Sequence, residues 1–381
     1  MATYVFEMPT KIMFGSGSVA QVGVEAAKLG TKAIIVTYPD IRRIGLLDEV
    51  ISNLRQHDVR SVVFDKVEPN PRASTTDAGA ELARREGIDL VIGLGGGSAM
   101  DAAKGVAIAA SGISPVWDYV AGKAQVTGTL SPVIQVPTMA GTGSEINAGA
   151  IITNWETHVK SSLRHPQAQA RVAIVDPRIH LSVPLRQTKA GGVDIFSHLV
   201  EGYVIDGAPS PLTDGIRETC MKMVVKYLPL AIEDLGNLAY REQLAWASTM
   251  AMSAFVRLGG GGGTMTNHGI EHAVSGYYDV VHGEGLAALL PAWMRSFARV
   301  RQDRFDKLAE TVFGGGEDDG IVATEKWLEN VGMRLRVRDL GCKLEDAEMI
   351  GQLAVESSPY LTMHPTPLDA PAVARIYREA W

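Results

Sequence analysis

The sequence predicts an α/β domain followed by an all-α domain, and three observations carry this prediction. Up to about residue 185, short β-branched runs alternate with helical patterns, which predicts a parallel sheet with helices on both faces. From Thr188 to Trp381, long amphipathic stretches replace the strand-like alternation. Pro184 stands between the two regions and marks the junction. We therefore expect domains at 1–184 and 185–381, and a length of 381 residues is typical of two domains.

The individual elements follow from the local pattern. Runs rich in valine and isoleucine favour strands, and apolar residues three and four apart favour helices. The expected strands are 32–37, 61–64, 89–93, 132–136 and 172–177, with helices between them at 41–57, 74–87 and 98–110. The expected helices of the second domain are 188–206, 211–233, 238–257, 264–276, 283–298, 301–313, 320–334 and 345–355.

Composition and charge exclude several classes of function. The net charge of -7 is spread over helices of mixed sign, and no long basic run is present, which argues against nucleic-acid or membrane-surface binding. The longest apolar stretch, 285–294, is too short to span a bilayer and contains a proline. The N-terminus does not resemble a secretory signal, and two distant cysteines do not predict a disulfide framework. We expect a cytoplasmic protein.

A glycine turn joins the third apparent strand to a helix. Gly95, Gly96 and Gly97 let backbone N–H groups approach an anion, and the helix N-terminus adds partial positive charge. Ser98 can cap the helix, and Asp101 can close a capping box. These residues predict a pyrophosphate site. The glycine spacing differs from the standard dinucleotide fingerprint, and a tight turn that binds no ligand is the alternative interpretation.

A second turn, at 136–145, also follows a strand. Hydroxyl groups at Thr138, Thr142 and Ser144 could donate hydrogen bonds to the phosphate, ribose or carboxamide of a coenzyme. A role of Ser144 as a cap or turn residue is the alternative.

A candidate metal site arises from one carboxylate and three imidazoles. Asp194 and His198 are four residues apart, so they lie on one helix face. His268 and His282 would be about 21 Å apart on a single straight helix, so the chain must turn between them. The segment 275–279, with a glycine to end the helix, is a credible break. The four side chains can then converge on one cation.

The set of donors limits the choice of ion. One carboxylate with three imidazoles suits Fe²⁺ or Zn²⁺ and excludes neither, whereas the lack of thiolate ligands argues against a structural zinc cage. His272 lies one turn after His268, where it could relay protons, support the ligands or simply pack. The other five histidines are interpreted as surface or satisfied core residues. The glycines at 259–263 are interpreted as a connector between helices, with a mobile wall of the cleft as the alternative.

Taken together, the motifs resemble those of the iron-dependent (group III) alcohol dehydrogenase family over nearly the whole chain. The segment 268–283 is most similar to the butanol-dehydrogenase branch. The matching motifs are Phe14–Gly17, Pro69–Pro71, Gly95–Ser98 with Asp101 and Lys104, Gly141–Glu145, Asp194 with His198, and the histidines 268, 272 and 282. The resemblance implies a Rossmann-like NAD(P)-binding domain and a helical catalytic domain, the fold also found in dehydroquinate synthase.

The resemblance also implies the roles of individual residues. Asp194, His198, His268 and His282 would bind the metal. Asn70 and Lys160 would lie in the coenzyme site, Lys160 near the nicotinamide, whereas an exposed charge is the alternative for this lysine.

The coenzyme preference depends on the residues after the first expected strand. Asp40 stands where butanol-dehydrogenase relatives have a glycine/serine turn that accepts the 2′-phosphate of NADP. A carboxylate would repel that phosphate and favour the ribose hydroxyl of NAD, although Arg42 and Arg43 could attract the phosphate. NAD or NADP is therefore expected, with NAD slightly favoured.

The function implied is that of a metal-dependent, NAD(P)-linked alcohol dehydrogenase or aldehyde reductase acting on a small primary alcohol or aldehyde. A polyol dehydrogenase of the glycerol type is the nearest alternative. A lyase resembling dehydroquinate synthase would need a basic cluster for a phosphorylated substrate, and none is evident. A non-catalytic dinucleotide sensor would have no reason to hold an open metal site. Relatives commonly form homodimers or larger assemblies.

Overall fold

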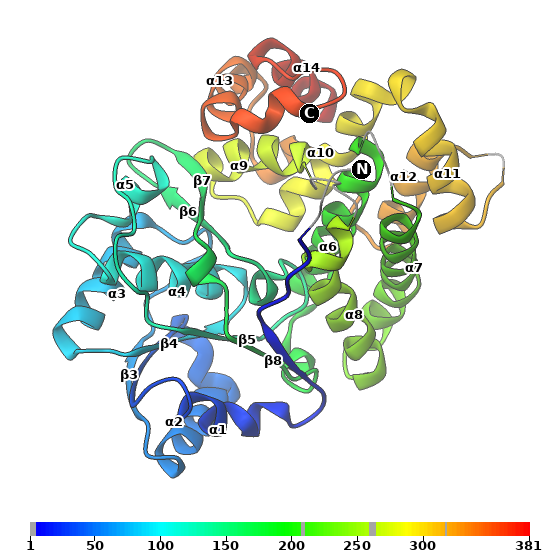
Figure 1. Ribbon diagram of the computed structural model, residues 1–381. Coiled ribbons are helices and arrows are strands. Elements are labelled where there is room, and N and C mark those ends of the chain that lie inside the picture. The colour runs from blue at the N-terminus through cyan, green and yellow to red at the C-terminus, as the bar shows by residue number, and fades with distance from the viewer. Residues whose placement is uncertain (1–4, 207–209, 259–263, 317) are drawn as a thin grey trace. The chain divides into compact units, whose positions relative to one another are not determined.

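The computed structural model describes residues 5–206, 210–258, 264–316 and 318–381 (Figure 1). The chain divides into two compact units. One comprises Met8–Val183, and the other comprises Pro184–Trp381 together with the described residues before Met8. The glycine run at 259–263, interpreted above as a connector, lies outside the described residues.

The unit Met8–Val183 contains a six-stranded sheet in which every pairing is parallel. Its strands are β1 (Lys11–Phe14), β2 (Lys32–Val36), β3 (Arg60–Phe64), β4 (Leu90–Gly95), β5 (Val133–Pro137) and β8 (Val172–Val175), in the order β1-β8-β5-β4-β2-β3. Residue Ile34 of β2, for example, stands opposite Val62 on one side and Val91 on the other.

Alternate residues along the strands build a core on each face of the sheet, because successive side chains of a strand point in opposite directions. Ile35 and Ile92 pack with one pair of helices, and Ile34 and Val91 pack with another. The first pair is α1 (Val22–Ala26) and α2 (Leu46–Gln56), and the second is α3 (Ala73–Glu86) and α4 (Gly97–Ala110). The predicted parallel sheet with helices on both faces is confirmed.

Several elements of this unit differ from the sequence prediction. Strand β1, the short helix α5 (Val116–Val120) and the antiparallel hairpin of β6 (Gly149–Asn154) and β7 (Val159–Arg164) were not predicted. β1 is only four residues long, too short to show a period. The helix expected at 41–57 begins only at Leu46, because Gly45 adopts a left-handed conformation (φ 71°) that interrupts it.

The described residues of the other unit form helices joined by turns and loops, without a strand. Its helices are α6 (Leu185–Ile205), α7 (Pro211–Glu233), α8 (Leu238–Ala251), α9 (Thr266–Tyr278), α10 (His282–Phe297), α11 (Gln302–Phe313), α12 (Gly320–Asn330), α13 (Ala347–Ser357) and α14 (Ala370–Ala380). The last of these was not predicted. None of the described helices has the length and apolar character needed to cross a bilayer.

The turn expected between His268 and His282 is present, but a different residue makes it. Gly276 lies buried inside α9, and the helix ends instead at Asp279, which adopts the left-handed conformation (φ 57°). Aspartate tolerates this conformation better than most residues, because its short side chain can hydrogen-bond locally. The result is that His268 and His282 lie on two successive helices.

His364 should make the stability of the helical unit depend on pH. Its ring is buried against Phe297, with 4.4 Å between ring centroids, and burial lowers its pKa to about 4. In the unfolded chain this pKa is about 6.5, so the unfolded state takes up the proton first as the pH falls. Stability is therefore complete above about pH 6.5 and decreases toward pH 4, by at most ~1.4 kcal/mol per pH unit.

The variant His364→Gln removes this titration, so its melting temperature should fall less steeply than that of the wild type between pH 6.5 and 4.5. His57→Gln, at a half-buried histidine of the other unit, is the control and should follow the wild type. Thermal unfolding at a series of pH values provides the measurement. Parallel curves for wild type and His364→Gln would contradict the assignment.

Candidate metal centre and coenzyme turns

Helix α6 presents Asp194 and His198 on one buried face, as their spacing predicts. Its start lies against the start of α10, where Gly283 allows close approach. A Cβ atom on Gly283 would stand only 2.1 Å from the carbonyl oxygen of Ala190, so no other residue fits without a backbone shift. This contact places His282, the first residue of α10, close to the acidic face of α6.

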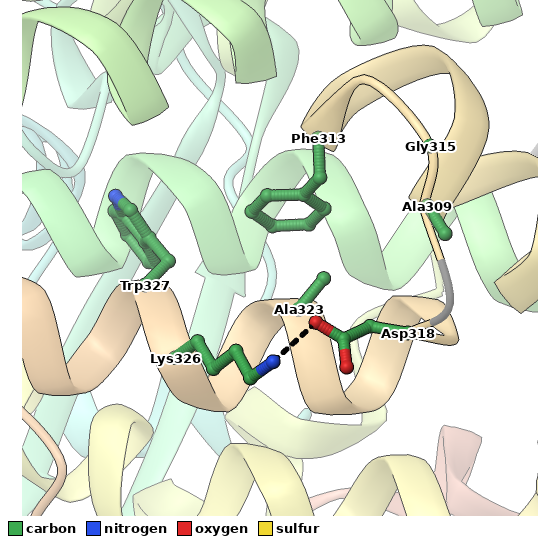
Figure 2. Close-up of a pocket in the computed structure, with 7 residues that line it drawn as sticks. All are labelled: Ala309, Phe313, Gly315, Asp318, Ala323, Lys326 and Trp327. Atoms are coloured by element: carbon green, nitrogen blue, oxygen red, sulfur yellow. Dashed lines mark hydrogen bonds and ion pairs between the residues drawn. The ribbon is translucent and has the colours of Figure 1, made fainter.

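The opposite face of α6 is held by aromatic packing. The ring centroid of Phe196 lies 4.6 Å from that of Trp327 and 6.2 Å from that of Phe313. Both of these partners also line a cavity of about 300 Å³ between α11 and α12, where Lys326 Nζ lies 2.6 Å from Asp318 Oδ2 (Figure 2). This cavity contains none of the candidate metal ligands.

Three of the four predicted ligands bring one donor atom each to a common point. Oδ1 of Asp194 lies 3.4 Å from Nε2 of His268 and 3.8 Å from Nε2 of His282, and the three donor atoms are all within 4.8 Å of one another. Ligands about 2.1 Å from a single ion are separated from each other by roughly 3–4 Å, so the spacing fits one cation.

His198 lies beside this group. Its Nδ1 is 3.2 Å from Oδ1 of Asp194 and is buried without a hydrogen-bond partner among the described residues. Its ring stacks on that of His268, with 4.3 Å between centroids. Burial of a ring nitrogen without a hydrogen-bond partner costs free energy, and coordination of a cation by this nitrogen would offset that cost.

Two buried glutamates, which the sequence analysis missed, hold the imidazole rings from behind. Nδ1 of His268 donates to Glu201 Oε1 at 2.5 Å, and Nδ1 of His282 donates to Glu271 Oε2. Both carboxylates are fully buried. In the neutral ring, donation from Nδ1 leaves the lone pair on Nε2, which is the tautomer that a metal ligand needs.

A sequence signal for these glutamates existed. Glu201 follows Asp194 by seven residues, which is two helical turns, so it extends the same face of α6. Glu271 follows His268 by three residues on α9, and Gly285 of α10 leaves room for it, since a Cβ there would lie 2.9 Å from its side chain. A carboxylate in otherwise apolar sequence beside a candidate ligand is the signal.

The electrostatics of the group are dominated by its buried carboxylates. Burial opposes ionisation of Asp194, but the neighbouring His198 and His268 hold its pKa well below the usual range. Burial likewise disfavours a charged His268, but Glu201 and Asp194 outweigh it and raise the pKa of His268 to about 10. Burial lowers the pKa of His198 to about 3. The buried carboxylates therefore favour the binding of one or more positive charges at this largely buried site.

His272 also faces the group. It is 6% exposed, and its ring centroid lies 5.7 Å from that of His282 and 6.4 Å from that of His268. Together with Glu271 and His282 it supplies donor atoms within 4.8 Å of one another. This position is compatible with the proton-relay or supporting role considered for it.

In the unit Met8–Val183, the glycine turn forms where expected, but its helix cap does not. Helix α4 begins with Gly96 as N-cap, and no side chain caps it, so the predicted capping box of Ser98 and Asp101 is wrong. The helix starts one residue before Ser98, which places that serine inside its first turn. The first N–H groups of α4 receive no side-chain cap and remain available to an anion.

The turns after β2 and β4 lie together at the carboxyl edge of the sheet. β2 and β4 are neighbours, and the chain continues from them to opposite sides of the sheet, through β3 and β5. Ligands of doubly wound sheets bind at such a switch point. Thr37 Oγ1 donates to the carbonyl oxygen of Leu94 at 2.6 Å and ties the two strand ends together. Asp40 follows on the exposed side, 3.2 Å from Arg43.

The second turn, after β5, packs directly on the first. The backbone N–H of Thr138 donates to the carbonyl oxygen of Gly95 at 2.9 Å. Thr142 touches the glycine turn so closely that a Cβ atom on Gly97 would lie 2.4 Å from Thr142 Cγ2. Ser144, by contrast, donates to Asp101 Oδ1 at 2.6 Å. The close approach of Thr142 to the glycine turn therefore requires glycine at position 97.

Lys160 and Asn70 lie together, as the resemblance implies for two residues of one site. Lys160 Nζ donates to Asn70 Oδ1 at 2.9 Å, and the two residues are 4% and 7% exposed. The alternative of an exposed charge at Lys160 is wrong, because β7 of the hairpin carries the side chain inward.

Comparison with known proteins agrees with this geometry. Residues 9–177 match the family model described as iron-containing alcohol dehydrogenase, and residues 188–381 match the model of the C-terminal part of that family. The chain is 30% identical to NADH-dependent butanol dehydrogenase A of Clostridium acetobutylicum, with complete coverage of both chains.

Two further comparisons point the same way. A probable NADH-dependent butanol dehydrogenase of Bacillus subtilis is 36% identical over 85% of this chain and 84% of the relative. The crystal structure of NADH-dependent butanol dehydrogenase A from Thermotoga maritima superimposes with a TM-score of 0.94 at 32% identity, covering 100% of this chain and 99% of the other. Together with the fold and the clustered histidines, these matches over both halves of the sequence show that the chain belongs to the iron-containing alcohol dehydrogenase family.

Proposed function

We propose that this protein is a metal-dependent, NAD-linked alcohol dehydrogenase and aldehyde reductase that acts on small primary alcohols and aldehydes. Membership of the iron-containing alcohol dehydrogenase family supports the reaction class. The observation that carries the proposal is the convergence of Asp194, His268 and His282 on one point, with two imidazoles oriented by buried glutamates.

We assign metal binding to Asp194, His198, His268 and His282. The donor spacing and the unpartnered nitrogen of His198 fit a single divalent ion, and the family description favours Fe²⁺, with Zn²⁺ compatible with the same donors. When bound, such a cation polarises the oxygen of an alcohol or a carbonyl. Asp194 supplies the negative charge that retains it.

We assign coenzyme binding to the two turns at the carboxyl edge of the sheet. Gly95, Gly96, Gly97 and Ser98 would face the pyrophosphate at the N-terminus of α4, with Thr138 and Thr142 beside them. Asn70 and Lys160 would lie near the nicotinamide, which carries the hydride. The relatives named above are NADH-dependent, and the exposed carboxylate of Asp40 agrees with NAD.

The remaining step is exchange of the alcohol proton with solvent, which we assign to His272. Its imidazole lies within the histidine group and is nearly buried, so it can accept a proton without displacing the ligands. A neutral imidazole can accept at one nitrogen while donating at the other. The glutamates behind His268 and His282 hold those rings still and exclude water from their far side.

Steady-state kinetics with a panel of substrates tests the proposed function. Metal-loaded enzyme should reduce butanal with NADH more efficiently than it reduces dihydroxyacetone. The rates with glyoxal and lactaldehyde then show whether the enzyme prefers simple or hydroxylated aldehydes. Preference for dihydroxyacetone would favour a polyol dehydrogenase. Absence of turnover with every aldehyde and both coenzymes would refute the proposal.

Replacement of Asp40 should change the coenzyme preference. Asp40→Ser removes a negative charge where the 2′-phosphate would lie, leaving Arg43 without its partner. Because an exposed charge pair is worth about 1 kcal/mol, kcat/KM for NADPH should rise about five- to ten-fold. Asp48→Ser, which removes an exposed carboxylate paired with Arg42, is the matched control. An unchanged NADPH:NADH ratio in Asp40→Ser would place the phosphate elsewhere.

We also propose a cytoplasmic homodimer or larger homo-oligomer. Strand β1 lies at one edge of the sheet, where further strands can pair, and Cys220 and Cys342 are buried and not joined, as suits a reducing compartment. Light scattering after size-exclusion chromatography measures the assembly, and cell fractionation measures the location. A monomeric mass would contradict the first part, and recovery outside the cytoplasm the second.

A further inference from the structure

The turn between α9 and α10 joins two of the assigned metal ligands. Helix α9 carries His268 and ends at Asp279, and helix α10 begins with His282. Only residues 279–281 link the two helices. A link of three residues leaves little slack, so a shift at the end of α9 would move His282 relative to His268.

Tyr278, the last residue of α9, binds a distant part of the chain through its hydroxyl group. The hydroxyl donates to Oδ2 of Asp346 and accepts from the backbone N–H of Lys343 at 3.0 Å. Burial and the carboxylate of Asp346 raise the pKa of Tyr278 to about 12, so the hydroxyl keeps its proton and remains a donor near neutral pH. The end of α9 is therefore attached to the segment 343–346.

That segment is itself held in place by helix α14. Tyr377, which is 0% exposed, donates to the carbonyl oxygen of Lys343 at 2.9 Å, and Trp381 Nε1 donates to the carbonyl oxygen of Cys342 at 3.3 Å. Helices α13 and α14 pack on each other and against α9 and α10 (Figure 1). Tyr278 thus connects the turn to a part of the helical unit that is fixed by its own packing.

The start of α10 is held from the other side by α6, through the close backbone contact described above and through an ion pair. Arg186 of α6 donates to Glu284 with Nε at 2.5 Å and with Nη2 at 2.7 Å. Glu284 lies in the first turn of α10, two residues after His282. His282 is therefore held between two attachments, with Tyr278 before it and α6 after it.

We propose that Tyr278 is a positioning residue for the metal centre: it fixes the turn between α9 and α10 and thereby sets the position of His282 relative to His268. The inference rests on the proposed metal binding. Tyr278 is not one of the assigned ligands, so it acts through the turn. Distances from a metal to its ligands vary by only about 0.2 Å between sites of one kind, so added freedom of the turn lowers the affinity.

The test compares the Zn²⁺ affinity of variants of the whole chain by competition with a chelator. Tyr278→Phe keeps the ring, whose centroid lies 4.9 Å from that of Tyr277, and removes only the hydroxyl. Its affinity should fall about five- to ten-fold, which is less than the loss expected when a carboxylate behind a ligating ring is removed. Tyr227→Phe, at a half-buried tyrosine of α7, is the matched control and should bind Zn²⁺ like the wild type.

A double-mutant cycle shows whether the hydroxyl acts through its bond to Asp346. Asp346→Ala removes the acceptor, so it should weaken Zn²⁺ binding about as much as Tyr278→Phe does. The variant with both changes should lose little more than either single variant. Asp346→Asn keeps an oxygen acceptor and should recover most of the affinity. Losses that multiply in the double variant would show two independent effects and contradict the proposal.

A spectroscopic measurement separates positioning from general stability. The visible absorption of bound Co²⁺ depends on the geometry of its ligands. At saturating Co²⁺, the absorption band of Tyr278→Phe should differ in position or intensity from that of the wild type. A protein that is merely less stable would give the wild-type spectrum once it is loaded.

The outcomes distinguish this inference from the function on which it rests. Wild-type protein that binds neither Zn²⁺ nor Co²⁺ would overturn the proposed metal centre, and the positioning role with it. Wild-type protein that binds both ions, with equal affinity and an identical Co²⁺ spectrum in Tyr278→Phe, would overturn only the positioning role of Tyr278.

Discussion

His268→Ala is expected to abolish metal retention and turnover together. The ring lies between Asp194, 3.4 Å from its Nε2, and Glu201, 2.5 Å from its Nδ1, so its removal takes away one donor atom and opens a void at the centre of the group. A Lewis-acid cation contributes several kcal/mol to stabilisation of the transition state, so kcat/KM should fall by at least ~10³-fold. Metal analysis after dialysis and an aldehyde-reduction assay measure both effects.

His57→Ala, at a half-buried histidine of the other unit, is the matched control and should retain metal and activity. Because loss of the ring leaves Glu201 buried without its partner, the variant should also be checked for folding by circular dichroism. Full activity in folded His268→Ala that has been stripped of metal would eliminate the mechanism.

Glu201→Gln is expected to weaken metal binding without removing any ligand. Glu201 accepts from the ring of His268 and also from the backbone N–H groups of Asn267, at 2.7 Å, and His268, at 3.2 Å. An amide offers one acceptor oxygen in place of two, so it cannot accept from the ring and from both backbone groups. Loss of a carboxylate behind a ligating imidazole typically reduces metal affinity 10- to 100-fold.

Competition with a chelator measures that affinity directly, independently of catalysis. Glu271→Gln should show a comparable loss, because Glu271 supports His282 in the same way. Glu310→Gln, at an exposed glutamate of α11, controls for the change in net charge. Wild-type metal affinity in both Glu201→Gln and Glu271→Gln would show that the buried carboxylates serve stability alone.

Much of the fold was accessible from the sequence because its elements are long or strongly patterned. The strands β2, β4 and β5 are largely apolar, as expected where both faces of a sheet are covered. Among the elements that were missed, β1 is only four residues long, whereas α14 has 11 residues and a clear buried face and could have been predicted. The capping box failed because the start of α4 is decided by the close packing of Gly97 on Thr142, a contact between distant residues.

The sequence by itself determined the class of fold, the family and the candidate ligands, because these depend on periodicity, on residue type and on fixed spacings along one helix. Only the tertiary structure decided which side chains support them. Glu201 meets His268 across 67 residues, and Lys104 meets Ser144 across 40, through contacts made when separate elements pack. Burial then determines the chemistry. A glutamate or lysine that is shielded from water must make its hydrogen bonds with neighbouring protein groups, and no local sequence pattern specifies which groups these are.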